Sequence, residues 1–395
     1  MKPLLLPAAQ PRRSVVYLAG FLFSLHLSLT NYINSSFLAQ NIHEELVGVV
    51  FSVAAGLAII ALLFTPSLIK KCGNVPFATA ITFVTILILL SLVNVFEPWL
   101  AIGLFMMYYV LGLVIFYTID LQLESLSEDK DTGGIRGTHL TVIHIAMMIS
   151  LISAGLILGD GENYRLVYLV AAIALLPFWY ITANFFSRIK IKDDRSSLLE
   201  TTKLLWQQKN RREKDLAKIL GIDFLVNFFF AFMLVYMPIY LHSHVGLSWT
   251  VIGWLFAFML LPFVLFLIPL GRLADNYLGE KEIMTAGLII TGLACLVIGN
   301  YTAPEPIVWA GLLFTTRLGI SATETMKESY LFKHISSDDA NILSLSRNTR
   351  PLAYIIAPLV ASALLIFFEF QFLFTFLGGV MILGLWFSLG ILDTK

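Results

Sequence analysis

Long apolar runs recur from one end of the chain to the other, and they restrict the fold more than any other feature of the sequence. A helix needs about 20 residues to cross the hydrocarbon core of a bilayer, where the backbone finds no hydrogen-bond partner outside the protein. Each run is near that length, so each is predicted to be a transmembrane helix. The twelve predicted spans are residues 14–38, 46–66, 76–96, 98–122, 137–158, 165–187, 219–242, 250–270, 283–301, 306–328, 342–367 and 370–391.

Composition supports an all-α polytopic membrane protein. Of 395 residues, 58% are hydrophobic and 13% are charged, with a mean hydropathy of +0.83. The formal net charge is zero, so the balance of charges indicates no nucleic-acid partner. The cysteines Cys72 and Cys295 do not suggest a disulfide framework or a thiolate metal site. The sequence therefore calls for no cofactor and no metal.

The distribution of Lys and Arg predicts the orientation. If the N-terminus lies inside, the inner segments hold nearly all basic residues near the spans, while the outer loops hold only Arg165. This bias places both termini in the cytoplasm. The first run follows basic residues, as in a signal peptide, but it is long enough to span and no small-residue cleavage site follows it. The expected location is a bacterial inner membrane, with the lipid bilayer as partner and a monomeric chain.

A long polar segment divides the spans into six and six. Residues 1–187 are predicted to form one six-helix bundle and residues 219–395 a second, pseudo-symmetric one. In the linker, residues 188–218, Ser197 and Glu200 form a capping-box pattern ahead of an apolar stretch. This pattern favours a basic amphipathic helix on the inner membrane face, and a disordered basic linker is the alternative.

The two halves contain a short internal repeat. "IDLQLES" (119–125) ends the fourth span and "TETMKES" (323–329) ends the tenth. Both read acid, three residues, Glu, Ser, at an offset of 204 residues (324 minus 120). Repeats of this kind are how many transporters are built.

The loop between the eighth and ninth spans carries a family resemblance. "GRLADNYLGEKE" (271–282) resembles the G-x-x-x-D-[RK]-x-G-[RK]-[RK] signature of the major facilitator superfamily. It departs from that signature by one inserted residue and by Asn276 and Glu280 in place of basic residues, and the equivalent first-half loop, "PSLIKKCGN", has no acid. The matching positions are Gly271, Asp275, Gly279 and Lys281.

The resemblance implies a solute cavity lined by spans 1, 4, 7 and 10, with spans 3, 6, 9 and 12 facing outward. The sequence agrees, because the outward spans contain no charged residue or histidine apart from Arg165, the first residue of the sixth span. Those within the other runs include His26, Asp120, His144, Asp223, Arg317, Glu324, Arg347 and Arg350.

Two of these residues are predicted to lie near the bilayer centre and to bind the solute. An arginine at the depth of Arg317 is costly unless it meets water, a partner or a ligand, and helical periodicity puts Ser321 on its face. His26 aligns with Thr30 and Asn34 in the same way, and it is the candidate proton carrier. The alternatives are an arginine bonded to a backbone carbonyl and a neutral histidine bonded within the bundle.

The remaining solute-site candidates are Tyr109 and Tyr117 in the fourth span and Asn227 in the seventh. Tyr109 and Tyr117 share one helix face with Asp120 and Glu124. No Asp or Glu lies in the central third of any span, whereas a carrier of organic cations would be expected to place one there. This absence favours an anionic or neutral solute.

Charges near the inner span ends are predicted to form a cytoplasmic gate. Such a gate would be made in one state and broken in the other, as alternating access requires. The resemblance implies that Asp275 caps the start of the fifth span near Gly137 and Thr138. Ordinary solvated charges are the alternative. The gate candidates are Asp120, Glu124, Arg136, Asp223, Gly271, Asp275, Gly279, Lys281, Glu324, Glu328, Arg347 and Arg350.

The pattern as a whole predicts a secondary active transporter for a small solute, with proton coupling through His26 as one possibility and sodium as another. The chain has no Gly-x-x-x-x-Gly-Lys-[ST] loop for ATP. The alternatives are a drug or lipid-like efflux carrier of the same fold, a receptor or scaffold, and a membrane-embedded transferase. A transferase would need a catalytic constellation that the sequence does not show.

Overall fold

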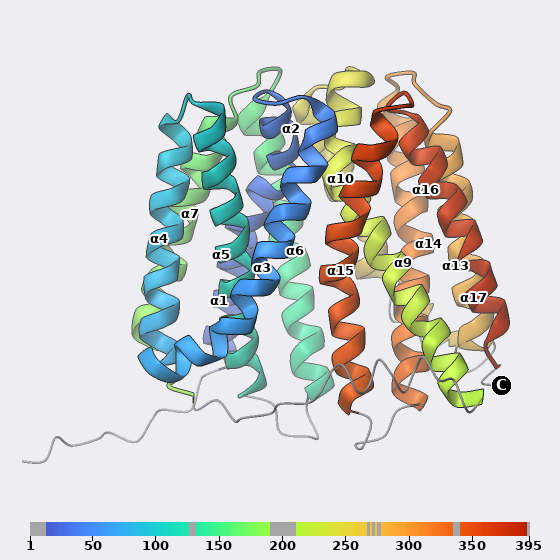
Figure 1. Cartoon of the computed structure of the whole chain (residues 1–395), viewed down its shortest axis with the longest axis horizontal. Helices are drawn as coiled ribbons and strands as arrows, with labels where there is room; N and C mark the ends of the chain where they lie inside the picture. The colour runs from blue at the N-terminus through green and yellow to red at the C-terminus, as the bar shows by residue number, and fades with distance from the viewer. Residues whose placement is uncertain are drawn as a thin grey trace, which may run out of the picture. The chain divides into compact units, whose positions relative to one another are not determined.

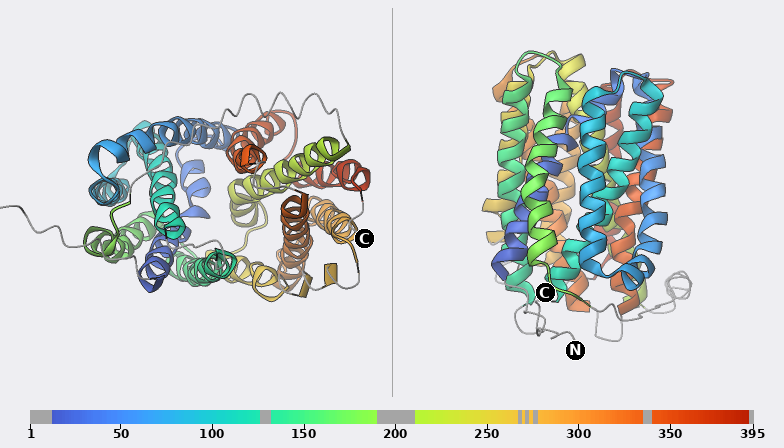
Figure 2. Two further views of the ribbon diagram at one scale, coloured as in Figure 1. Left: turned by 90° about the horizontal axis from the view of Figure 1, so that it is seen from below. Right: turned by 90° about the vertical axis from the view of Figure 1, so that its left-hand side faces the viewer.

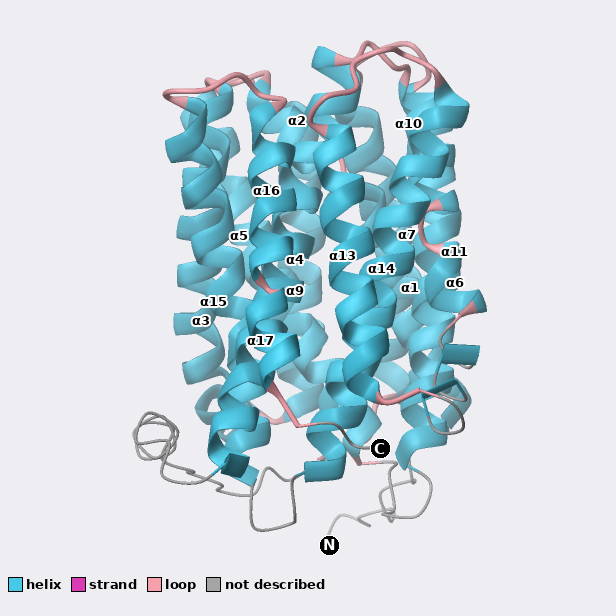
Figure 3. Cartoon of the chain, turned by 90° about the vertical axis from the view of Figure 1, so that its right-hand side faces the viewer, coloured by secondary structure: helices cyan, strands magenta, loops and turns pink. Residues whose placement is uncertain are grey.

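The computed structural model describes residues 13–125, 132–189, 211–266, 269–270, 273–274, 278–334 and 340–392. Every regular element in these ranges is a helix (Figures 1 and 3). The longer helices are α1 (Arg13–Asn31), α3 (Glu44–Cys72), α4 (Asn74–Asn94), α5 (Pro98–Glu124), α6 (Thr132–Leu158), α7 (Tyr164–Phe185), α9 (Arg211–Ile239), α10 (Trp249–Phe258), α13 (Glu280–Ile298), α14 (Pro306–His334), α15 (Ala340–Leu365) and α16 (Phe372–Leu383). The shorter ones are α2 (Asn34–Ala39), the π-helix η1 (Tyr240–His244), α11 (Leu261–Leu265) and α17 (Leu385–Gly390).

The twelve-span expectation is confirmed in outline. Ten helical segments are long and apolar enough to cross a membrane, and residues Trp249–Leu265 form a shorter apolar helix. The twelfth is α14, which has 29 residues but carries Arg317 and Glu324 within its length. The chain is therefore an integral membrane protein of the predicted all-α class.

The helices fall into two compact units. Unit 1 comprises residues 1–42 and 53–193, and unit 2 comprises residues 43–52 and 194–395, so α3 begins in unit 2 and continues in unit 1. Within unit 1, α1 packs on α6 and α7, and α4 packs on α5 and α7. Within unit 2, α13 packs on α14 and α16, and α9 packs on α15. The predicted boundaries at residues 187 and 218 stay predictions, and most of the predicted linker lies outside the described residues.

Several predicted spans are interrupted. The first, expected as one helix over 14–38, breaks at Tyr32 and Ile33, where the amide of Ile33 bonds to the carbonyl of Thr30 at 3.0 Å. Asparagines and threonines at this point offer hydrogen bonds that compete with the helical pattern. The last predicted span breaks at Gly384, between α16 and α17. The seventh starts at Arg211, earlier than expected, and ends in the π-helix η1 just after Pro238.

Two glycines allow α13 and α14 to pack closely in unit 2. A Cβ atom at Gly319 of α14 would lie 2.6 Å from the carbonyl oxygen of Gly287 and 2.8 Å from the amide nitrogen of Thr291. A Cβ atom at Gly287 of α13 would meet the carbonyl oxygen of Gly319 at 2.5 Å. Small residues at such crossings are how membrane helices gain van der Waals contact.

Replacing Gly319 by Val is expected to lower the free energy of unfolding by about 1–3 kcal/mol, because backbone atoms of α13 cannot move aside for the new side chain. The matched control is Gly311→Val on the same helix, where an added Cβ would meet nothing within 4 Å. Thermal unfolding of both variants in detergent checks this prediction. Equal midpoints for the two variants would contradict it.

Candidate functional site

A buried polar cluster lies in unit 1 around His26 of α1. The imidazole is fully buried, and its Nδ1 lies 2.6 Å from the carbonyl oxygen of Phe23. A carbonyl oxygen only accepts hydrogen bonds, so Nδ1 carries the proton and Nε2 presents a lone pair. The Nε2 atom is buried and has no partner among the described residues. A buried acceptor without a donor is uncommon in folded proteins, so His26 stays a candidate for ligand contact.

Thr30 and Asn34, which are predicted to share the helix face of His26, contact two tyrosines. The hydroxyls of Thr30 and Tyr108 lie 2.6 Å apart, and the Tyr168 hydroxyl donates to Oδ1 of Asn34 at 2.8 Å. The sequence did not single out Tyr108 or Tyr168. The ring centroid of Tyr108 also lies 6.2 Å from that of His26, edge to face.

The other candidates of unit 1 lie elsewhere on α5. Tyr109 and Tyr117 are half-buried, whereas Asp120 and Glu124 are exposed. The ring of Tyr109 packs on that of Phe105, at 6.2 Å between centroids.

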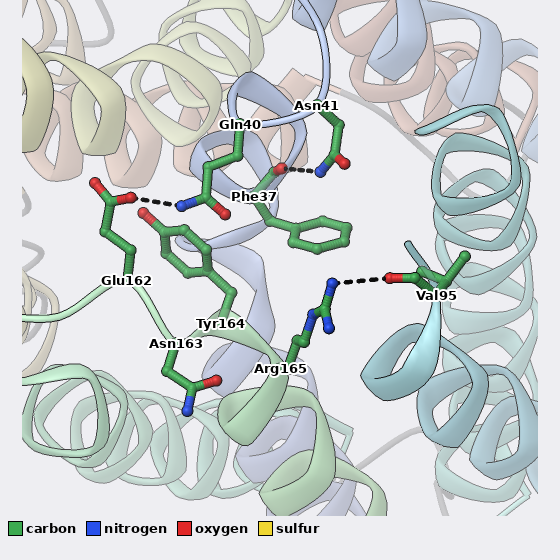
Figure 4. Close-up of a pocket in the computed structure, with 8 residues that line it drawn as sticks. All are labelled: Phe37, Gln40, Asn41, Val95, Glu162, Asn163, Tyr164 and Arg165. Carbon is green, nitrogen blue, oxygen red and sulfur yellow. Dashed lines mark hydrogen bonds between the residues drawn. The ribbon is translucent and has the colours of Figure 1, made fainter. Parts of the chain in front are cut away.

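A polar pocket of about 470 Å³ lies at one end of unit 1 (Figure 4). The Arg165 side chain donates to the carbonyl oxygen of Val95 at 3.1 Å, and Gln40 donates to Glu162 at 2.6 Å. The Phe37 ring lines this pocket and packs edge to face on Tyr168, which bonds to Asn34. The pocket itself contains none of the predicted site residues.

In unit 2, Arg317 of α14 is buried at 3% exposure. Its guanidinium carbon lies 5.4 Å from the ring centroid of Phe229 and 5.3 Å from that of Phe230, both on α9. Its Nε atom has no hydrogen-bond partner among the described residues. Ser321, predicted on the same face, is buried and bonds to the carbonyl of Leu318 at 3.0 Å. The alternative of an arginine bonded to a backbone carbonyl finds no support among the described contacts.

Asp223 of α9 lies at the centre of a second buried cluster in unit 2. One carboxylate oxygen forms an ion pair with Lys327 of α14 and accepts from Asn227 at 3.1 Å. The other accepts from Ser346 and Thr349 of α15, each at 2.7 Å. Asp223 and Lys327 are both buried, and four donors from three helices surround this carboxylate. The cluster joins α9, α14 and α15.

The sequence missed Lys327 as the partner of Asp223, although a signal was present. Lys327 lies on the same face of α14 as Ile320, Thr323 and Tyr330, three, four or seven residues away, and all of these are buried. A lysine on a buried helix face needs an anionic partner.

The structure describes some of the remaining gate candidates and not others. Glu324 is half-buried, and Glu328 and Arg350 are exposed, with the Arg350 guanidinium 5.6 Å from the Tyr354 ring. Gly279 precedes α13, and Lys281 is half-buried in its first turn. Gly271 and Asp275 lie outside the described residues, as do the side chains of Arg136 and Arg347. The gate therefore stays a prediction.

Glu280, which departs from the loop signature, is buried in the first turn of α13. It forms an ion pair with Lys333 of α14 and accepts a hydrogen bond from Ser329 at 3.0 Å. The sequence did not identify this contact.

The described residues form a bundle of apolar helices with polar and charged side chains buried inside it, which is typical of polytopic membrane transporters. The family model described as Major Facilitator Superfamily matches residues 16–251 and 219–394, and the chain belongs to this superfamily. It is a transporter, not an enzyme. No protein with a curated description matches the sequence.

Two solved structures of the nucleoside transporter NupG share the fold. One, of a mutant NupG, matches with a TM-score of 0.77 and 13% sequence identity. The other matches with a TM-score of 0.73 and 14% identity. Each match covers 95% of this chain and 98% of that chain. At these identities the similarity shows the fold alone.

Lys327→Met is expected to lower the free energy of unfolding by about 3–5 kcal/mol, because it leaves the buried carboxylate of Asp223 without its counter-ion. The double variant Asp223→Leu with Lys327→Met removes both charges and is expected to recover most of that loss. Unfolding in detergent measures both. The ion pair is unimportant to stability if the single variant unfolds like the unchanged protein.

Proposed function

We propose that the chain is a secondary active transporter that moves a small neutral or anionic solute by alternating access. The observation that carries this proposal is Arg317, a buried guanidinium whose Nε atom has no partner among the described residues. Burying a cation without a counter-ion is costly, and the cost is offset when a ligand binds it. The planar guanidinium can donate two parallel hydrogen bonds to a carboxylate or phosphate, or single bonds to hydroxyl and carbonyl oxygens.

The surroundings of Arg317 limit the solute further. The rings of Phe229 and Phe230 lie beside the guanidinium and would contact the apolar or planar part of a solute. A cationic solute would be repelled, because no carboxylate pairs with Arg317 among the described residues. A solute that combines a ring with hydroxyl, carbonyl or acidic groups therefore suits this part of unit 2.

In unit 1, His26 is the proposed hydrogen-bond acceptor for a solute. Its Nε2 lone pair can accept a hydrogen bond from a solute hydroxyl or N–H, or it can take up a proton. The proposal includes proton coupling through this atom. Thr30, Asn34, Tyr108 and Tyr168 hold the surrounding helices in register through their hydrogen bonds.

Nucleosides are one solute class that meets these requirements. Both NupG structures are described as those of a nucleoside transporter. A nucleoside is neutral at physiological pH, with a planar base that suits the two phenylalanines and sugar hydroxyls that suit the Arg317 guanidinium. A drug or lipid-like efflux carrier is the competing function, and it would not need the arginine.

We also propose the orientation and organisation that the sequence predicts. The proposal comprises cytoplasmic termini in a bacterial inner membrane, a monomeric chain, the boundaries at residues 187 and 218, and the cytoplasmic gate. The concentration of Lys and Arg at one end of the spans supports the orientation.

Arg317→Gln is expected to reduce solute uptake at least tenfold, since a hydrogen bond to a charged group contributes about 1.5–3 kcal/mol and 1.4 kcal/mol corresponds to tenfold. Proteoliposomes are offered radiolabelled nucleosides, sugars, monocarboxylates and sugar phosphates to find the solute and measure the loss. The control, Lys71→Gln, removes an exposed cation outside the spans' buried faces and should retain uptake. Equal uptake by Arg317→Gln and Lys71→Gln would show that Arg317 does not bind the solute.

His26→Gln is expected to abolish the dependence of uptake on an imposed pH gradient, because glutamine cannot carry a proton at neutral pH. Exchange of labelled for unlabelled solute, which needs no driving force, should persist. The matched control is His144→Gln on α6, a half-buried histidine whose Nδ1 also bonds to a backbone carbonyl, that of Leu140, at 2.8 Å. A pH-gradient response that survives His26→Gln would refute coupling through this residue.

A further inference from the structure

A groove of about 570 Å³ lies between the start of α4 and the end of α7 in unit 1. The right-hand view of Figure 2 shows these two helices, and they pack against each other. The lining residues are Val75, Pro76, Thr79, Ala80, Phe83, Trp179, Ala183 and Arg188. From Val75 to Phe83 the groove follows α4 for eight residues, about 12 Å at 1.5 Å per residue. It is mostly apolar, with an arginine at one end.

The side chains around the groove form a lipid-facing surface. On α4, Phe83 is 49% exposed and Leu87 is 48% exposed, and on α7, Tyr180 is 57% exposed. Both helices are long and apolar enough to span a membrane. Large apolar side chains exposed on such helices contact hydrocarbon, so the groove is open to acyl chains of the bilayer.

Trp179 contributes an unused hydrogen-bond donor to this apolar lining. Its ring packs on Phe83 at 6.1 Å between centroids, and its Nε1 atom is buried with no partner among the described residues. Indole nitrogen only donates, and buried donors are nearly always bonded. Because the protein itself buries this atom, an acceptor oxygen of a molecule in the groove would complete the bond once the indole ring turns toward the groove.

Arg188 is held at the groove's end by the backbone on either side of it. The carbonyl of Ser187 accepts from Asn74 at 2.7 Å and from Gln122 at 2.8 Å. The amides of Ser187 and Ile189 donate to the same two side chains, at 3.2 and 3.0 Å. These four bonds fix the segment that follows α7 against α4 and α5. The Arg188 side chain is exposed and can meet a phosphate at the membrane surface.

We propose that this groove binds one anionic phospholipid from the leaflet at the Arg188 end of the spans. An acyl chain lies along Val75, Ala80 and Phe83, the phosphate pairs with Arg188, and an ester carbonyl accepts from Trp179. In the orientation proposed above, this is the cytoplasmic leaflet. The bound lipid would stabilise the segment around Arg188 that follows α7. The site is separate from the proposed solute contacts and does not depend on which solute is carried.

The test uses purified, delipidated full-length protein and compares phosphatidylglycerol with phosphatidylcholine of the same acyl chains. Native mass spectrometry counts bound lipid, and thermal unfolding reports stabilisation. Phosphatidylglycerol is expected to bind at least tenfold more tightly than phosphatidylcholine. Arg188→Gln should remove that preference, Trp179→Phe should weaken binding of both lipids, and Ala80→Trp should block the groove to both.

The control Lys71→Gln removes an exposed cation that does not line the groove and should leave binding unchanged. The proposal is overturned if Lys71→Gln reduces the preference as much as Arg188→Gln, since the attraction would then be a general surface effect. It is also overturned if both lipids bind the unchanged protein equally. Stabilisation by inorganic phosphate alone, to the extent seen with phosphatidylglycerol, would identify a free-anion site instead.

Discussion

Hydrocarbon offers no hydrogen-bond partner, so every polar group inside a span must be satisfied by the protein or by a ligand. Many hydroxyls among the described residues meet the requirement locally. Thr82 and Thr85 of α4 each donate to the carbonyl four residues earlier, at 2.8 Å. Ser150 of α6 bonds to carbonyls of both α6 and α1. The hydroxyls of such residues are satisfied within the protein and need no ligand.

The same constraint divides the buried ionisable side chains into two groups: those whose hydrogen bonds are complete within the protein and those that keep an unbonded nitrogen. Asp223 accepts from four donors, and its cluster with Lys327 is complete, which suits a joint between helices. Arg317 and His26 each keep a buried nitrogen without a partner among the described residues. A group that the protein leaves unsatisfied at this cost is better placed to meet a ligand than one already bonded. Unit 1 therefore offers a neutral acceptor and unit 2 a fixed cation.

Hydropathy was enough to predict the helices, because spans need length and apolarity and little else. It could not predict the break after Asn31 or the crossing at Gly287 and Gly319, which depend on contacts between helices. Depth along a span was the basis for selecting His26 and Arg317, and both are buried in the folded chain. Sequence spacing selected Tyr109, whereas the neighbouring Tyr108 is the residue whose hydroxyl contacts Thr30 of α1. Adjacent helical residues point about 100° apart, and which of them faces α1 is set by packing.

Residues near span ends were the hardest to interpret, because charge alone does not distinguish a gate from a fixed pair. The burial of Glu280 is apparent only in the folded chain, whereas the apolar residues seven positions before and three positions after Lys327 could have indicated a buried helix face. At Glu280 an acid stands where the superfamily signature has a basic residue, and this acid forms an ion pair with Lys333 of α14. The opposite charge is thus provided by the neighbouring helix. A residue that departs from a motif therefore has to be judged together with the residue that it contacts in the folded chain.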